Sequence, residues 1–135
     1  LSENIPFSDN SFDVLINIES SHCYGDMPKF LSEAYRTLKK DGFFLFCDFR
    51  TLDGLQELYD QLSSSDFKFL NRIDITSNII QGLDKLSEYR EDQIDKSVSI
   101  FIKKLFKTYA GIKGTEIYNS FANNSMVYIC AILKK

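Results

Sequence analysis

The stretch NSFDVLINIESSHCY, residues 10–24, decides the fold and supplies the first functional residues. Residues 12–18 are almost continuously apolar and rich in β-branched side chains, which predicts a short strand covered on both faces, as parallel strands are. A carboxylate, Glu19, and the only histidine of the chain, His22, follow directly. In an open α/β sheet, ligands bind in the loops that leave the carboxyl ends of the strands. We therefore expect a functional site in this loop.

The segment after this loop predicts a helix and a second buried strand. Asp26 and Pro28 suit the start of a helix, since Asp caps a helix well and Pro fits its first turn. We expect the helix to end at Gly42, behind basic residues that suit the negative end of its dipole. Residues 43–49 are again mostly apolar and predict a second buried strand.

Polar residues follow or end both predicted strands. Asp48 closes the second strand, as Glu19 and His22 follow the first. A strand–helix–strand unit with short connections is almost always right-handed, and its two strands run parallel. We therefore expect Glu19, His22 and Asp48 to lie near one edge of the sheet.

The rest of the chain predicts further α/β elements. Residues 53–65 predict an amphipathic helix, and apolar alternation over 67–75 predicts a strand that is covered on one side. Helical spacing continues over 77–110, where the polar section 87–95 suggests a break between two helices. Residues 126–133 predict the last strand. Without repeats or linkers, we expect one domain.

Composition limits the classes of protein that the chain can belong to. The 135 residues are 44% hydrophobic and include twelve Phe, among them Phe101 in the long helical pattern. They can build one core, and the high Phe content indicates either large apolar surfaces packed between layers or an apolar substrate. The net charge of −3 gives no general attraction to nucleic acid, and no apolar run reaches the roughly 20 residues of a membrane span. We expect a cytoplasmic protein in which Cys23, Cys47 and Cys130 are reduced thiols without metal-ligand spacing.

His22 and Asp48 each allow a structural and a catalytic interpretation. A lone loop histidine is most often a polar surface residue, but a neighbouring carboxylate would let it take a proton from a hydroxyl. Asp48 fits a solvated acid or a helix cap as well as an orienting partner. Glu19 fits a ligand for a hydroxyl or an amine. His22 and Cys23 do not predict a metal pair, because adjacent residues rarely converge on one ion.

The sequence resembles the class I S-adenosylmethionine-dependent methyltransferases of the type 11-like group. IPFSDNSFDV, residues 5–14, is similar to the segment that leads into the fourth strand of that family. Residues 38–45, LKKDGFFL, resemble its Leu-Lys-Pro-Gly-Gly turn and fifth strand, with one glycine retained. Residues 17–24 and 47–50 are similar to the phthiotriol-type lipid and polyketide O-methyltransferases. The resemblance covers essentially the whole chain and implies the C-terminal portion of a Rossmann-like, three-layer αβα domain with a mixed sheet.

The resemblance also implies a cofactor, an acceptor and residue roles. The cofactor would be S-adenosylmethionine, and the acceptor a hydroxyl on a lipid-like or polyketide small molecule. Ile5 would pack on the adenine, and Asn17 would line the methionine end of the cofactor, with Glu19 beside it. His22 and Asp48 fall where related enzymes keep a base and its acidic partner.

The family's main cofactor-binding elements precede the segments matched here. These are a Gly-rich loop and an acid after the second strand, and Leu1-Ser2 also departs from the family's usual Asp-Ala pair. We expect residues 1–135 to form a partial domain that is inactive alone. The unpaired sheet edge beside residues 12–18 predicts self-association, a swapped element, or disordered residues ahead of Leu1. The alternative is a non-catalytic methyltransferase remnant, or a half-domain that acts as an interaction module.

Overall fold

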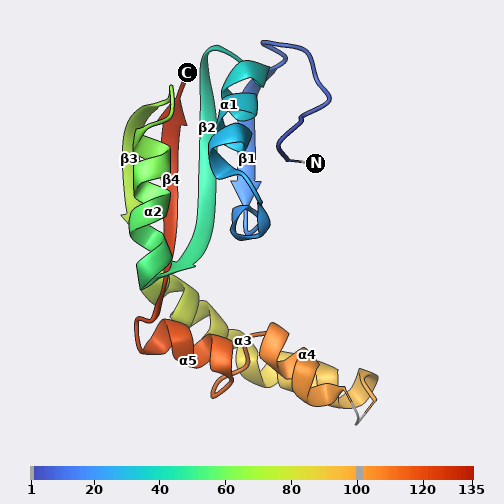
Figure 1. Cartoon of the computed structure of the whole chain (residues 1–135). Coiled ribbons are helices and arrows are strands. Elements are labelled where there is room, and N and C mark those ends of the chain that lie inside the picture. The colour runs from blue at the N-terminus through green and yellow to red at the C-terminus, as the bar shows by residue number, and fades with distance from the viewer. Residues whose placement is uncertain (1, 100–101) are drawn as a thin grey trace. The chain divides into compact units, whose positions relative to one another are not determined.

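The computed structural model describes residues 2–99 and 102–135, so Leu1 and Phe101 of the sequence analysis lie outside the described residues. Figure 1 shows the elements in chain order: β1 (Phe12–Ile18), the 3₁₀ turn η1 (Ser21–Cys23), α1 (Met27–Thr37), β2 (Leu38–Thr51), α2 (Leu52–Ser63), β3 (Lys68–Asp74), α3 (Thr76–Ser97), α4 (Lys103–Tyr109), α5 (Glu116–Ala122) and β4 (Met126–Lys134). Contacts divide them into two compact units where the sequence predicted one domain. One unit holds the residues before Ile75 together with Tyr128–Lys135, and the other holds Ile75–Val127.

The four strands form one mixed sheet, which confirms the predicted fold class. Their order is β1-β2-β4-β3, so β1 forms one edge of the sheet. β1 runs parallel to β2, as the strand–helix–strand unit predicted, and β3 runs antiparallel to β4. Each strand lies where it was predicted, although β2 is longer at both ends.

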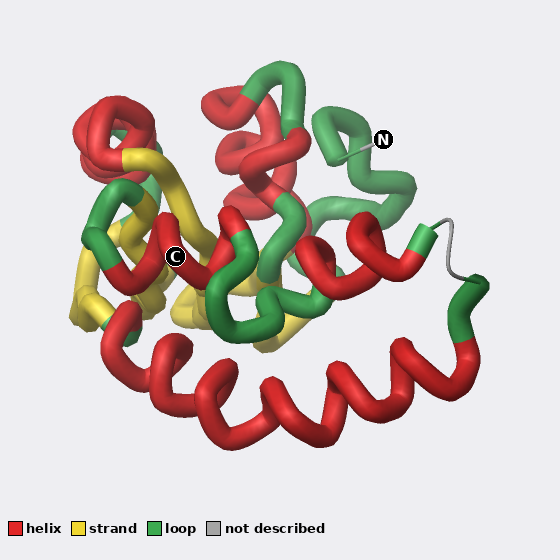
Figure 2. Tube along the Cα trace, turned by 90° about the horizontal axis from the view of Figure 1, so that it is seen from below, coloured by secondary structure: helices red, strands yellow, loops and turns green. Residues whose placement is uncertain are grey.

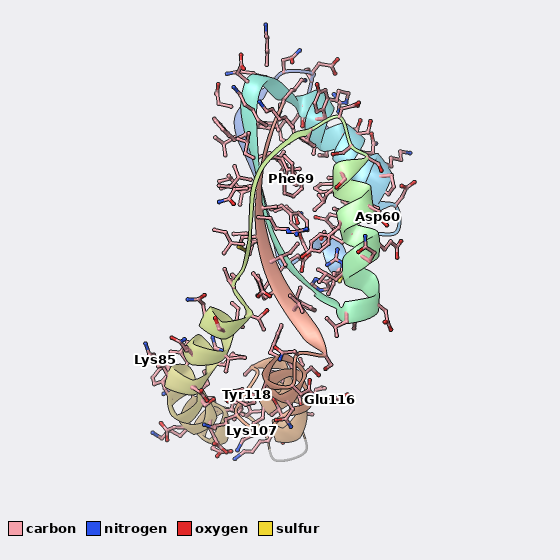
Figure 3. The ribbon with its side chains drawn as sticks, turned by 90° about the vertical axis from the view of Figure 1, so that its left-hand side faces the viewer. Asp60, Phe69, Lys85, Lys107, Glu116 and Tyr118 are labelled. Atoms are coloured by element: carbon pink, nitrogen blue, oxygen red, sulfur yellow. A yellow bond between two sulfur atoms is a disulfide. The ribbon has the colours of Figure 1, made fainter. Side chains whose placement is uncertain are left out.

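Helices α1 and α2 lie on the same face of this sheet (Figure 3). Phe44 and Phe46 of β2 are buried at 0% and 1% exposure. Val14, Ile16 and Ile18 of β1 are 46%, 62% and 61% exposed. The prediction that β1 is covered on both faces is therefore wrong for the described residues, because no described helix of this unit packs on the second face. β3 is exposed along its whole length, so its predicted half-coverage is also wrong.

Helix α1 ends five residues earlier than predicted, at Thr37 rather than at Gly42. Leu38 already has the extended backbone of β2, with φ −75° and ψ 142°. Besides Arg36 in the last turn, Lys135 supplies a cation at the end of the helix, since its Nζ donates to the carbonyl oxygens of Tyr35 and Leu38, both at 2.7 Å. Local basic residues therefore gave the wrong helix end.

Helix α3 runs without interruption through residues 87–95, where the sequence suggested a break (Figure 2). It ends at Ser97, and α4 begins at Lys103. The buried Ser87 is accommodated because its hydroxyl donates to the carbonyl oxygen of Leu83 at 2.7 Å. A polar side chain that bonds the preceding helical turn need not end a helix.

Cys47 of β2 and Cys130 of β4 form a disulfide, so the prediction of three reduced thiols is wrong for these two. They are 83 positions apart in sequence. They meet because β4 lies beside β2 in the sheet, which cysteine spacing does not reveal. Cys23 is free and exposed. In the described parts of the chain, no helix is long and apolar enough to cross a membrane.

The start of β2 bulges against β1. Phe12 pairs with Leu38, but Val14 pairs with Phe43, so the intervening residues of β2 loop out of register. Asp41, within this bulge, has a φ of 65°, in the left-handed region that few non-glycine residues adopt. At Gly42, the last residue of the bulge, the backbones of the two strands approach each other closely.

We expect Gly42→Ala to lower the free energy of unfolding by about 1–3 kcal/mol. A Cβ atom at Gly42 would lie 2.9 Å from the carbonyl oxygen of Lys39 and 3.0 Å from that of Asp13. Both contacts are with backbone atoms, which cannot move aside without disturbing the strands. Gly82→Ala is the control, because a Cβ there meets nothing within 4 Å and alanine favours a helix. Urea denaturation of both variants should give opposite signs, and a stable Gly42→Ala variant would contradict the close approach.

Candidate active site

The carboxyl ends of β1 and β2 meet at one edge of the sheet, as predicted. Ile18 pairs with Cys47, and the next residue, Glu19, continues the ladder by donating its N–H to the Cys47 carbonyl oxygen at 2.9 Å. The turn η1 then brings His22 against Asp48, the residue after Cys47 on β2. The strand–helix–strand argument therefore located this juxtaposition correctly.

His22 is held by Asp48 through two atoms. Its ring Nδ1 lies 2.9 Å from Oδ1 of the carboxylate, and its backbone N–H donates to Oδ2 at 3.1 Å. The ring also packs against Phe49, with a centroid distance of 4.4 Å. A carboxylate only accepts hydrogen bonds, so the neutral ring carries its proton on Nδ1 and leaves Nε2 as an acceptor. The side chain of His22 is 30% exposed, whereas that of Asp48 is fully buried.

Asp48 remains ionised in spite of its burial. Burial alone would raise the pKa of this carboxyl group. Hydrogen bonds from the Ser21 hydroxyl at 2.6 Å, from His22 and from the Phe49 N–H at 2.9 Å, together with the charge of Arg50 at 3.4 Å, outweigh burial and hold the pKa below its ordinary value. The site therefore contains a fixed negative charge behind the imidazole.

Ser21 and Arg50 are site residues that the sequence analysis missed. The guanidinium of Arg50 donates to the Ser21 hydroxyl at 2.8 Å, so the two side chains close a ring of contacts around Asp48. A sequence signal exists for Arg50, because alternation along a strand places residues 48 and 50 on one face. The helix-cap interpretation of Asp48 is wrong, since the Thr51 hydroxyl caps α2 instead.

A second polar cluster surrounds Asn17 at the end of β1. The side-chain amide of Asn17 donates to the Ser20 hydroxyl at 2.9 Å and to the Tyr24 hydroxyl at 2.7 Å. Its Oδ1 is buried and has no hydrogen-bond partner among the described residues. Glu19 accepts from the Tyr128 hydroxyl at 2.8 Å, and burial, then Glu19 itself, raises the pKa of Tyr128, so that hydroxyl remains a donor.

Ile5 is tied to α1 through its backbone. Glu33 accepts from the Ile5 N–H at 3.0 Å, and Arg36 donates to the Ile5 carbonyl oxygen at 3.0 Å. The hydrogen bond from Arg36 is the largest cause that lowers the pKa of Glu33 to about 2. In the described residues, no hydrogen bond joins Ile5 to Asn17 or Glu19.

A small pocket of about 190 Å³ lies beside His22. Arg50 of β2 and Glu57 and Gln61 of α2 supply charged or hydrogen-bonding walls, as do the hydroxyls of Ser21 and Tyr24. Met27 of α1 also lines the pocket. The pocket is thus polar at the histidine. Within the described ranges, no group of three or more His, Cys, Asp or Glu side chains is arranged to hold a metal ion.

Comparisons with known proteins give the class of this chain. Residues 2–46 match a family described as a methyltransferase domain. Phosphoethanolamine N-methyltransferase 2 of Haemonchus contortus, solved with phosphomonomethylethanolamine and S-adenosylhomocysteine, superposes with a TM-score of 0.82 at 15% identity, over 99% of this chain and 36% of that one. The chain has the fold of the class I S-adenosylmethionine-dependent methyltransferases.

Within that class, the chain resembles the phthiotriol methyltransferases, as the sequence motifs predicted. It is 30% identical over 127 residues to the phthiotriol/phenolphthiotriol dimycocerosates methyltransferase of Mycobacterium leprae, which covers 94% of this chain and 47% of that protein. It is 26% identical over 127 residues to the fatty-acid O-methyltransferase of Mycolicibacterium smegmatis, over 94% of this chain and 46% of that protein. The chain spans about half the length of the curated relatives that it matches.

Proposed function

We propose that this chain contributes the acceptor-binding and proton-removing part of a methyltransferase that uses S-adenosylmethionine to methylate a hydroxyl of a lipid-like or polyketide small molecule. The observation that carries the proposal is the His22–Asp48 pair at the joined ends of β1 and β2. The names of the two curated relatives, which refer to lipids, support an apolar acceptor.

In this mechanism the chain's own residues remove the hydroxyl proton. S-Adenosylmethionine supplies a methyl group that its sulfonium already activates. With the cofactor bound, Nε2 of His22 would accept the proton of the acceptor hydroxyl as its oxygen takes the methyl group, and the electron pair of the carbon–sulfur bond would stay on sulfur. Asp48 keeps the proton on Nδ1 in the resting ring and stabilises the imidazolium that forms. Alignment of donor and acceptor supplies much of the remaining acceleration.

The His22–Asp48 pair favours a hydroxyl over a carboxylate as the acceptor. A carboxylic acid is already ionised at neutral pH, so its methylation needs no base. A hydroxyl has a far higher pKa, and a histidine supported by the carboxylate of Asp48 meets that requirement. The proposed product is therefore a methyl ether.

A labelling experiment separates the ether from an ester. A polypeptide that carries these residues within a complete methyltransferase domain is given methyl-labelled S-adenosylmethionine and either a long-chain alcohol or a fatty acid of equal length. We expect label in an alkali-stable ether from the alcohol. Label that appears mainly in an alkali-labile ester would overturn the hydroxyl assignment.

Ile5, Asn17 and Glu19 form the cofactor contacts in this proposal. Buried polar atoms nearly always have a partner, so the lone Oδ1 of Asn17 suits a donor group of the bound cofactor. The carboxylate of Glu19, steadied by Tyr128, suits a hydroxyl or an amine. Ile5 offers an apolar side chain for the adenine.

The exposed face and edge of β1 favour a second candidate, a half-domain that acts together with another polypeptide. Val14, Ile16 and Ile18 are largely exposed along a strand at the edge of the sheet. Such an edge pairs readily with another strand. A second copy of the chain, or a segment that completes the methyltransferase domain, would pair with it.

We expect no measurable binding when S-adenosylhomocysteine is titrated calorimetrically into the 135-residue chain. Asn17 and Glu19 are the polar residues that we assign to the cofactor, and two polar side chains hold a molecule of that size weakly. Micromolar affinity for the chain alone would contradict the proposal of a half-domain. It would show that the residues of this chain suffice to bind the cofactor.

A further inference from the structure

The pocket beside His22 fits the end of a ligand rather than a whole one. Its volume is about 190 Å³. Pockets that enclose drug-sized ligands usually measure about 300–1,000 Å³. Arg50, Glu57 and Gln61 face this space together with His22. A purely hydrocarbon end would make no hydrogen bond with these polar walls, whereas a polar end could.

The polar walls retain hydrogen-bonding capacity. One carboxylate oxygen of Glu57 accepts from the Gln61 amide at 3.0 Å, and the other takes part in none of the described hydrogen bonds. Arg50 donates from its two terminal nitrogens to the Phe49 carbonyl oxygen and the Ser21 hydroxyl, and its Nε–H is in none of the described hydrogen bonds. The hydroxyl that loses its proton to His22 would use only Nε2. The site therefore offers at least one further acceptor and one further donor.

The charges around the pocket favour a neutral group there. Arg50 and Glu57 are opposite in sign, and the buried carboxylate of Asp48 already lies 3.4 Å from Arg50. A carboxylate entering the pocket would meet Glu57, and an ammonium would meet Arg50. A hydroxyl can donate to Glu57 and accept from Arg50 at the same time.

We propose that this pocket binds a second hydroxyl of the acceptor, so that the acceptor is a diol with its hydroxyls on adjacent or next-but-one carbons. This inference rests on the proposed function and specifies its substrate class. The first hydroxyl bonds to Nε2 of His22 and the second bonds to Glu57 and Arg50, with the apolar remainder of the acceptor outside the pocket.

The single histidine makes a direct test possible. The chain contains one His, so ¹⁵N-histidine labelling gives one imidazole to follow by NMR. The probes are 1,3-butanediol, 2-butanol, 3-hydroxybutyrate and 3-amino-1-butanol, each titrated into the full chain without cofactor. We expect a saturable shift of the His22 nitrogens with the diol, at an affinity about fivefold or more above that of the mono-alcohol, because the second hydroxyl adds hydrogen bonds to Glu57 and Arg50. The charged probes should bind more weakly than the diol.

Two variants locate the second hydroxyl. Glu57→Ala removes the acceptor and should reduce the diol affinity toward that of 2-butanol. Asp53→Ala, the same kind of truncation at an exposed position of α2 outside the pocket, should leave it unaltered. Three results would overturn the proposal that the acceptor is a diol. These are equal affinities for the diol and the mono-alcohol, tighter binding of a charged probe, and no saturable shift with any probe. None of these results depends on methyl transfer, which the labelling experiment tests separately.

Discussion

His22→Ala is expected to lower the turnover of the complete enzyme by about a hundredfold or more, with little change in its affinity for S-adenosylmethionine. In the proposed function the imidazole removes the hydroxyl proton, and its contact with Asp48 sets which nitrogen would receive it. Turnover would be measured with saturating acceptor and cofactor, and cofactor affinity by calorimetry.

The matched control is the neighbouring residue. Cys23→Ala removes an exposed free thiol from the same turn and should leave turnover within about twofold, as surface changes usually do. If His22→Ala turns over as fast as the unmodified protein, the histidine is not the base. If both variants lose turnover equally, the conformation of the turn, and not the imidazole, accounts for the loss.

Asp48→Asn is expected to lower the free energy of unfolding at pH 7 by about 3 kcal/mol, a cost typical of removing one partner from a buried charged network. The carboxylate is fully buried and accepts from Ser21, from both the backbone and the ring of His22, and from the Phe49 N–H. An amide presents N–H groups to some of these donors and leaves Arg50 without its buried counter-charge. Urea denaturation measures the difference.

The pH dependence of this difference follows from the lowered pKa of Asp48. A carboxyl group with a lowered pKa in the folded state stabilises the fold above its ordinary pKa of 3.8, and this stabilisation is lost as the pH falls through the folded-state value. The deficit of Asp48→Asn should therefore shrink below about pH 4. Asp13→Asn, an exposed acid that contacts Lys39, should cost less than about 1 kcal/mol. A deficit that is the same at pH 3 and pH 7 would contradict an ionised Asp48.

The sequence alone determined the parts of this protein that depend on short stretches of chain. Two apolar runs predicted β1 and β2, and the short connection between them predicted that they are parallel. This right-handed strand–helix–strand unit brings His22 to Asp48. The class followed from motifs within the same region. Because these features arise from neighbouring residues, a single sequence carries them.

The tertiary structure decided the features that depend on distant strands and on which faces are covered. Tyr128 reaches Glu19 across 109 positions, and Cys130 reaches Cys47 across 83, only because β4 returns to lie beside β2. An apolar residue such as Ile16 has the same pattern whether a layer covers it or not, so its exposure could not be read from alternation. Local periodicity reports the shape of a segment, whereas burial and pairing are set by what packs against it.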